Sequence, residues 1–306
     1  VRTAVAATFA EVDRAGAEFE IPPLGPALLS ERPPTGRDLA HGPVGSSQLA
    51  LFGASMAVHR ALCGVGLRAD RLVAVSFGEI AALTAAGVFE VADGARIACR
   101  LAQCLSSCEG GMTLLAGGES SARSLLREVG SPHLVIACVN DPEETVLSGP
   151  VPLLERVEQA AADAGVQTAR LKLPFLSHHP SLSQAADTFA AAVREVPHHP
   201  ARLPVHSAVL GRAYTASDDF AAGLSACLTD PVRLPDVLDG AAVSASPLFL
   251  EAGTGSALTH STRRALGPGR AEAHAPLATP DFPWDDEATR RRWRAGDTQK
   301  PHLPRS

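Results

Sequence analysis

Ser76 lies where a short apolar run gives way to a helical pattern, in the stretch RLVAVSFGEIAAL. A serine on a sharp strand-to-helix turn can act as a nucleophile, because helix N–H groups there face a developing oxyanion. Gly78 stands two residues after Ser76 as this elbow pattern requires, but Ala74 occupies the earlier position where glycine is usual. Serine is also a common helix N-cap. The stretch by itself leaves the catalytic and the structural interpretation equally open.

A serine nucleophile needs a base, and His178 is a candidate for it. His178 follows a strand-like run in KLPFLSHHPSL and precedes Pro180, where a helix can begin. Histidine titrates near neutral pH, so it can accept a hydroxyl proton. The adjacent His179 has the same chemistry, and no acidic residue is marked by the sequence as a third partner.

The composition limits the classes of function that remain. The chain has 306 residues with a net charge of −6, which argues against a nucleic-acid-binding domain. Its six cysteines form no C-x-x-C pair and no zinc-like spacing with histidine, so we predict no metal site. Cys104 and Cys108 lie one helical turn apart, which more often indicates packing than chemistry. No run approaches the ~18 apolar residues of a membrane span, and with no leader pattern the free thiols favour a cytoplasmic location.

The pattern of apolar residues and chain breakers predicts an α/β fold in two parts. Residues 1–108 and 174–268 alternate helices with short strands, and within the first of these ranges 20–38 is a proline-rich loop. Residues 109–173 have the order strand, helix, strand, strand, helix, strand, which is typical of a ferredoxin-like module. We expect this module to be an insert, and we expect 269–306 to be an irregular tail whose basic cluster is solvated.

Six motifs occur in one order along most of the chain: SQLALF at 47–52, VSFGEIAAL at 75–83, ACVNDPEETVLSG at 137–149, FLSHHP at 175–180, CLTDPVRLPDVL at 227–238 and FLEAGTGSALT at 249–259. They resemble the motifs of the malonyl-CoA:acyl-carrier-protein transacylases and of the acyltransferase domains of polyketide synthases. The separation of Gln48 from Ser76 fits that family without a gap. The resemblance implies a large α/β-hydrolase-like subdomain with a parallel sheet, carrying the ferredoxin-like insert.

The resemblance also implies a mechanism. Ser76, deprotonated by His178, would attack an acyl thioester and hold the acyl group as an ester. The substrate would be acyl-CoA or acyl-phosphopantetheine with no bound cofactor, and the partner an acyl carrier protein in polyketide or related biosynthesis. A backbone carbonyl orients the histidine in this family, at the position that matches Cys227, and the Phe77 N–H would be an oxyanion donor. Gln48 would line the pocket, with Asn140 near its mouth.

Three departures from the family pattern bear on activity and specificity. The family opens with a strand and a Gly-Gln-Gly-Ser loop that supplies a second oxyanion donor, and nothing within residues 1–306 matches it; loss of that strand would open a sheet edge or leave a gap. Val75 replaces the usual elbow histidine. Leu101 stands 25 residues after Ser76, where malonyl-selective members carry a carboxylate-binding arginine. Arg100 is adjacent, and a shift of register would let it serve instead.

These departures predict a neutral acyl substrate, because a malonyl carboxylate beside Leu101 would lack a counter-charge. The segment that begins at Phe175, FLSH, also matches neither sequence that the resemblance links to malonyl or methylmalonyl selection. Three functions remain open: a transferase to an acyl carrier protein, an editing hydrolase on the same scaffold, and a catalytically silent carrier-binding homologue. Arg123, Arg263 and Arg264 are candidates for contacts with an acidic carrier, the alternative being ordinary solvated charges.

Overall fold

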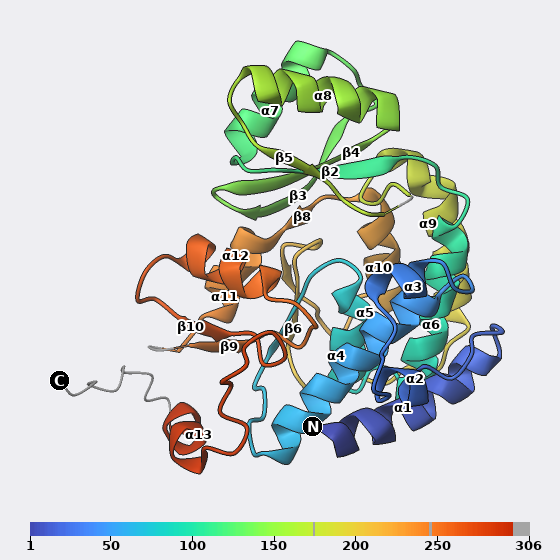
Figure 1. Cartoon of the computed structure of the whole chain (residues 1–306), viewed down its shortest axis with the longest axis vertical. Helices are drawn as coiled ribbons and strands as arrows, with labels where there is room; N and C mark the ends of the chain where they lie inside the picture. The colour runs from blue at the N-terminus through green and yellow to red at the C-terminus, as the bar shows by residue number, and fades with distance from the viewer. Residues whose placement is uncertain (174, 245–246, 296–306) are drawn as a thin grey trace.

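The computed structural model describes residues 1–173, 175–244 and 247–295. In Figure 1 the segment predicted as an insert forms the upper lobe, and the remaining helices and strands form the larger body beneath it. The chain crosses from the body into the insert after α6 (Val91–Leu105) and returns through the segment that leads to His178. The two parts are therefore joined directly beside the expected histidine.

The insert has the predicted element order. Its strands and helices are β2 (Gly111–Leu115), α7 (Glu119–Val129), β3 (Val135–Asp141), β4 (Glu144–Gly149), α8 (Val151–Asp163) and β5 (Thr168–Arg170). The strands pair antiparallel in the order β5-β2-β4-β3, which is the ferredoxin-like arrangement, so that prediction is confirmed. Both helices pack on one face of this sheet, around Leu115, Leu147 and Leu154, which are fully buried.

The insert's sheet continues into the body. Strand β8 (Val232–Arg233) pairs parallel with β3 through the Cys138–Val232 and Val139–Arg233 registers. Val232 is fully buried in a cluster that the body contributes. The five-stranded sheet therefore spans both parts of the molecule and fixes the insert above the body.

The body is mainly helical. Its helices are α1 (Arg2–Ala17), α2 (Leu24–Leu28), α3 (Gly36–Ala40), α4 (Ser46–Gly64), α5 (Gly78–Ala85), α6, α9 (Ser183–Arg194), α10 (Phe220–Thr229), α11 (Leu234–Ala241) and α12 (Ala257–Leu266). Two of these, α2 and α3, lie in the segment predicted to be loop. They form because local side chains satisfy their first N–H groups: Asp13 accepts from Leu24 and Gly25, and Thr35 and Asp38 form a capping box.

The strands of the body do not form one continuous parallel sheet. Strand β1 (Leu72–Ala74) pairs parallel with β6 (Val205–Ser207), and β7 (Arg212–Ala213) adds antiparallel to β6. Strand β9 (Leu248–Leu250) pairs parallel with β10 (Glu272–His274) in a separate sheet. Val73 of β1 and Phe249 of β9 nonetheless pack against the same buried cluster from α11. Parallel pairing is confirmed, but within the described residues it is divided among three sheets, as β1–β6, β9–β10 and the β3–β8 pair of the five-stranded sheet.

In the core of the body, two phenylalanine rings pack directly against glycines of neighbouring helices. Phe9 of α1 is 1% exposed, and a Cβ on Gly53 of α4 would lie 2.6 Å from its Cζ atom. Phe52 packs in the same way against Gly94, where a Cβ would lie 2.6 Å from the ring. These close approaches let α1, α4 and α6 pack tightly beside the elements that carry the site.

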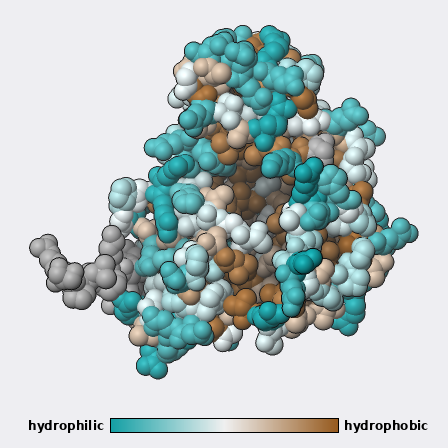
Figure 2. Space-filling view, viewed as in Figure 1, coloured by the Kyte–Doolittle hydropathy of each residue, from teal (hydrophilic) through white to brown (hydrophobic). Residues whose placement is uncertain are grey.

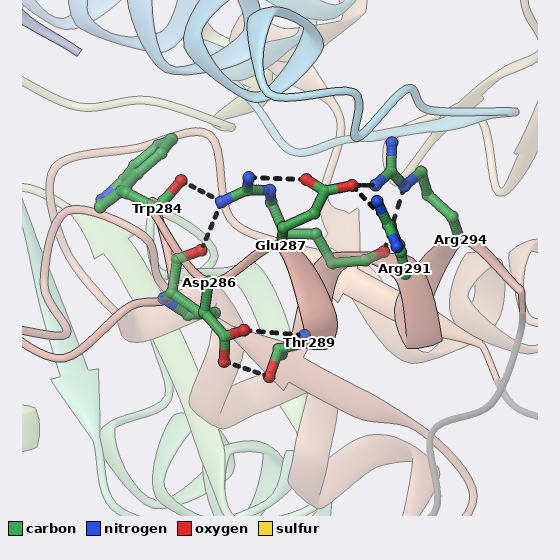
Figure 3. Close-up of polar contacts among 8 residues, drawn as sticks. Trp284, Asp286, Glu287, Thr289, Arg291 and Arg294 are labelled. Atoms are coloured by element: carbon green, nitrogen blue, oxygen red, sulfur yellow. Dashed lines mark hydrogen bonds and ion pairs between the residues drawn. The ribbon is translucent and has the colours of Figure 1, made fainter.

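The C-terminal segment is more ordered than predicted. Strand β10 and helix α13 (Glu287–Arg294) fall within it, and its two tryptophans pack on a cluster with Val58 and Leu62 of α4. Figure 3 shows how the helix is stabilised. Asp286 caps its N-terminus by accepting from the Thr289 N–H at 3.1 Å. Glu287 pairs with arginines at 290, 291 and 294, so three of the four arginines of the basic cluster are engaged in ion pairs. The prediction of an irregular, merely solvated tail is wrong for the described part; 296–306 lie outside the described residues.

Among the described residues, no helix combines the length and the apolar character that crossing a membrane requires.

Candidate active site

Ser76 lies on a sharp turn between β1 and α5. Its backbone has φ = 52°, in the left-handed region that residues other than glycine rarely adopt. The turn is closed by two backbone hydrogen bonds, in which Gly78 N–H donates to Val75 O at 3.0 Å and Glu79 N–H donates to Ser76 O at 2.9 Å. Phe77 is the N-cap of α5, so its N–H precedes the helix's own hydrogen-bond ladder. The predicted elbow geometry is present.

The structure brings His178 to this turn across 102 positions of sequence. Its Nε2 atom lies 2.6 Å from Ser76 Oγ, and its Nδ1 atom lies 2.8 Å from the backbone oxygen of Asp230. A carbonyl can only accept a hydrogen bond, so Nδ1 carries the proton and donates it. Nε2 is then left with a lone pair facing the hydroxyl of Ser76. This is the tautomer that a general base requires.

The carbonyl that orients His178 is not the predicted one. Cys227 was the expected position, but the carbonyl that accepts from Nδ1 belongs to Asp230, three residues later. The reason lies in α10, which ends at Thr229. Asp230 follows in an extended conformation (φ −99°, ψ 148°), so its carbonyl turns away from the helix axis. Cys227 is still inside the helix, where carbonyls point along the axis.

Burial sets the protonation of His178. The side chain is 2% exposed, and this desolvation lowers the pKa of His178 because it disfavours the charged imidazolium. The hydrogen bond to the Asp230 carbonyl opposes this, since it favours the protonated ring. The imidazole is therefore neutral at neutral pH. A neutral imidazole beside a hydroxyl can take the hydroxyl proton when a nucleophilic attack develops.

His178 also has a left-handed backbone, with φ = 54°. Such a conformation costs about 1–3 kcal/mol and persists where the surrounding contacts enforce it. For His178 those contacts include its neighbour. His179 is 6% exposed, its N–H donates to Leu228 O, and its ring lies 3.2 Å from the His133 carbonyl of the insert. Sequence reasoning gave His179 no separate role, because its partners are distant in the chain.

The two residues predicted to decide acyl selectivity lie on different sides of α6. Leu101 is 5% exposed and belongs to the main core cluster, against which Phe77 and Phe175 also pack. Arg100 is exposed; its guanidinium lies over the ring of Phe19 at 5.1 Å and donates to Gln103 at 3.2 Å. One helical step turns a side chain by roughly 100°. The possibility that Arg100 serves this site is therefore wrong.

The other predicted pocket residues are Gln48, Val75 and Asn140, and of these Val75 belongs to the Ser76 turn itself. Gln48 is half-buried in the first turn of α4, and Val75 packs against the cluster that contains Val232. Asn140 is committed elsewhere, since its amide donates to Glu144 Oε1 at 2.8 Å across the β3–β4 hairpin. Figure 2 shows a hollow below the insert in which hydrophobic residues gather.

The three arginines proposed for partner contacts all have intramolecular partners. Arg123 pairs with Glu119 at 2.5 Å, and Arg263 donates to the carbonyl of Ala273. Arg264 of α12 lies 3.6 Å from Asp141 and 3.6 Å from Glu143 of the insert's hairpin. A groove of about 430 Å³ opens between α12 and this hairpin, lined by Glu143, Arg263 and Arg264 among others. Of the three arginines, only Arg263 and Arg264 line this groove.

No group of three or more His, Cys, Asp or Glu side chains among residues 1–173, 175–244 and 247–295 is arranged to hold a metal ion.

Known proteins share both the sequence pattern and the fold. The model of the acyl transferase domain family matches residues 40–294. A non-reducing polyketide synthase of Penicillium herquei is 32% identical over 178 residues, which cover 56% of this chain and 8% of that protein. A malonyl-CoA:acyl carrier protein transacylase of Xanthomonas oryzae pv. oryzae superimposes with a TM-score of 0.77 at 27% identity, over 90% of this chain and 87% of that one. The acyltransferase domain from the second module of the salinomycin polyketide synthase gives a TM-score of 0.76 at 28% identity, over 92% and 64%. The chain thus spans less than a tenth of the curated polyketide synthases it matches, and it belongs to the acyltransferase family, whose members are enzymes of acyl transfer.

Proposed function

We propose that this protein transfers a neutral acyl group from a thioester donor to the phosphopantetheine thiol of an acyl carrier protein, through an ester on Ser76. The observation that carries the proposal is the 2.6 Å contact between Ser76 Oγ and His178 Nε2, with Nδ1 held by a carbonyl. A catalytically silent homologue would have no need of this tautomer or of two left-handed residues facing one another.

The first half-reaction forms the acyl ester. His178 Nε2 takes the proton of the Ser76 hydroxyl while Oγ attacks the thioester carbonyl, and the Oγ–C bond forms. The Phe77 N–H, at the start of α5, would stabilise the oxyanion. The C–S bond then breaks, and the imidazolium returns its proton to the leaving thiolate. The Asp230 carbonyl holds the ring in register throughout.

The second half-reaction reverses these steps with a new thiol. The carrier's phosphopantetheine thiol gives its proton to His178 Nε2, and its sulfur attacks the ester carbonyl. A C–S bond forms, the C–Oγ bond breaks, and the proton returns to Ser76. If water takes the place of the thiol, the same steps release a free acid, which is the hydrolase alternative.

The lining supports a neutral acyl group. We propose that Leu101 and Phe175, which are apolar and share the main core cluster with Phe77, border the acyl group, while the Arg100 guanidinium lies over Phe19. A malonyl carboxylate would have to be buried there without a cation beside it, which costs several kcal/mol. Acyl groups without a second carboxylate carry no such penalty.

An acyl carrier protein is the proposed partner. One solved structure of this fold, 24% identical to the chain, shows a type II polyketide acyl carrier protein in complex with its malonyl-transacylase. We propose that Arg263 and Arg264, beside the groove between α12 and the insert, face an acidic carrier here. The reduced, free cysteines fit a cytoplasmic setting.

The proposal is tested by incubating the protein with acetyl-CoA, longer acyl-CoA and malonyl-CoA, with and without a holo acyl carrier protein. Mass spectrometry of the carrier and assay of free acid separate the outcomes. Acyl-carrier product that exceeds free acid, with acetyl or longer chains preferred over malonyl, supports the proposal. Free acid formed at the same rate without the carrier supports the hydrolase, and preferred malonyl transfer defeats the neutral-acyl assignment.

A further inference from the structure

Glu79 lies in the first turn of α5, three residues after Ser76, and is completely buried. Its backbone N–H closes the Ser76 turn, as described above. Its side chain accepts two hydrogen bonds from outside α5. Tyr214 Oη donates to Oε1 at 2.6 Å, and Cys227 Sγ donates to Oε2 at 3.1 Å. We name Glu79, Tyr214 and Cys227 together the Glu79 cluster. It lies directly behind the nucleophile's turn.

Tyr214 reaches this carboxylate because a glycine makes room for it. It is the single tyrosine in the chain. A Cβ on Gly223 of α10 would lie 2.1 Å from Tyr214 Oη and 2.7 Å from its ring. The ring also packs against Phe220 at 5.5 Å between centroids. The first half of α10 therefore leaves room for the side chain of Tyr214, whose hydroxyl donates to Glu79.

Cys227 connects the same helix to the turn a second time. Besides its contact with Glu79, its Sγ lies 3.8 Å from the backbone oxygen of Ser76. Three residues further on, Asp230 ends α10 and holds the ring of His178. One helix therefore carries both the thiol that contacts the nucleophile's turn and the carbonyl that orients the base. The distance between Ser76 and His178 depends on how α10 is fixed to α5.

We propose that Glu79, Tyr214 and Cys227 are positioning residues, which lock α5 to α10 and so hold Ser76 Oγ within hydrogen-bonding distance of His178 Nε2. This inference rests on the proposed role of Ser76 as nucleophile. None of the three side chains touches the reacting atoms. The thiol of Cys227, at the position where sequence reasoning expected only a backbone contribution, acts here through its S–H group.

The Glu79 carboxyl accepts from both donors of the cluster, Tyr214 and Cys227. The pKa of Glu79 is raised, because burial outweighs the hydrogen bonds that lower it. Burial and the neighbouring Glu79 also raise the pKa of Tyr214, so its hydroxyl keeps its proton and donates to Glu79. Removal of either donor would leave a polar atom of the buried Glu79 carboxyl without its partner, which makes this connection between α5 and α10 costly to break.

The test measures how fast Ser76 reacts in variants that remove one donor each. A fluorophosphonate is the probe, because it bonds to an activated serine oxygen with loss of fluoride and the serine proton passes to the base. Intact-protein mass spectrometry gives the maximal labelling rate and the probe concentration at half-saturation. Tyr214→Phe removes one donor and Cys227→Ala removes the other, while Cys227→Ser keeps a hydroxyl donor. Thermal unfolding identifies temperatures at which every variant remains folded.

We expect Tyr214→Phe and Cys227→Ala to lower the maximal labelling rate about tenfold, with half-saturation unchanged, because sub-ångström misplacement of reacting atoms slows chemistry without weakening binding. Cys227→Ser should recover most of the rate. If both donor-less variants label at the wild-type rate, or if Cys227→Ser is as slow as Cys227→Ala, the inference is overturned. Should Tyr214→Phe fail to fold, the Cys227 pair decides the matter alone.

The controls keep this result separate from the proposed function. Ser76→Ala must abolish labelling. If wild-type protein does not label, or if Ser76→Ala still labels, the proposed nucleophile is wrong. If Ser76 of the wild-type protein is labelled, and the donor variants are labelled at the same rate, Ser76 remains the nucleophile but the positioning role of the Glu79 cluster is disproved.

Discussion

Ser76 and His178 face each other from two left-handed backbone positions, with φ of 52° and 54° and 2.6 Å between Oγ and Nε2. Within the described residues, the only other residue besides glycine with positive φ is Glu20. Strained backbone concentrates at functional sites because surrounding contacts must enforce it. Here the turn into α5 enforces one conformation, and the His179 contacts with Leu228 and His133 enforce the other. These contacts therefore hold the side chains of Ser76 and His178 toward each other.

The dyad should behave as a unit. We expect Ser76→Ala and His178→Ala each to lower kcat for acyl transfer by at least ~10³-fold, since neither group works without the other. The double variant should be about as slow as either single one. Stopped-time transfer assays with a holo carrier protein measure this. Independent, multiplying losses in the double variant would show that the two residues do not act in one step.

The pH dependence should report the burial of His178. Because burial lowers its pKa, the imidazole stays neutral, and able to accept a proton, to a lower pH than an exposed histidine does. We expect kcat/KM to be constant near neutral pH and to fall as pH drops through a midpoint below the ordinary value of about 6.5. A profile of kcat/KM between pH 4.5 and 8, with a small thioester, checks this. A midpoint at or above the ordinary value would contradict the buried, carbonyl-held ring.

Specificity should follow residue 101 and not its neighbour. We expect Leu101→Arg to raise the ratio of malonyl to acetyl transfer about tenfold or more, because a buried carboxylate gains a charge-assisted partner. Arg100→Gln is the matched control and should leave the ratio unchanged, since Arg100 lies over Phe19. Competition assays with mixed acyl-CoA donors give both ratios. An altered ratio in Arg100→Gln would restore the discarded role of Arg100.

Carrier recognition should depend on α12. We expect Arg264→Glu to lower kcat/KM for a holo carrier protein about tenfold and to spare transfer to free pantetheine, because charge complementarity steers protein association. Arg156→Glu, on a helix of the insert, is the control and should change neither rate. Equal losses with carrier and pantetheine in Arg264→Glu would instead mean that breaking its contacts with Asp141 and Glu143 disturbs the site itself.

The sequence predicted the dyad but not the elements that fix it. Ser76 and His178 could be found because both lie in short motifs whose residue types are chemically constrained. Asp230 could not, because α10 was not predicted: its sequence FAAGLSACLT is apolar and small throughout and lacks helical periodicity. The position of α10 relative to α5 depends on Tyr214 and Glu79, which form a hydrogen bond across 135 positions of sequence. The tail was mispredicted for a similar reason, since its order depends on tertiary packing against α4.

Stability should reveal how closely α1 and α4 approach. Gly53→Ala places a methyl group 2.6 Å from Phe9 Cζ, and we expect it to lower the free energy of unfolding by about 1–3 kcal/mol through overpacking. Gly36→Ala is the matched control, because a Cβ there meets no atom within 4 Å. It should be neutral or slightly stabilising. Urea unfolding followed by circular dichroism measures the free energy of unfolding of both variants. If Gly53→Ala has the same free energy of unfolding as the wild type, the packing described for α1 is contradicted.

The most direct test of the central claim is the mass of the protein itself after exposure to an acyl-CoA in the absence of any acceptor. The account predicts a single added acyl group, mapped by peptide sequencing to Ser76, that a holo carrier protein then removes and that Ser76→Ala never acquires. An acyl adduct that persists in Ser76→Ala, or wild-type protein that turns over thioesters without ever carrying the acyl group, would contradict it.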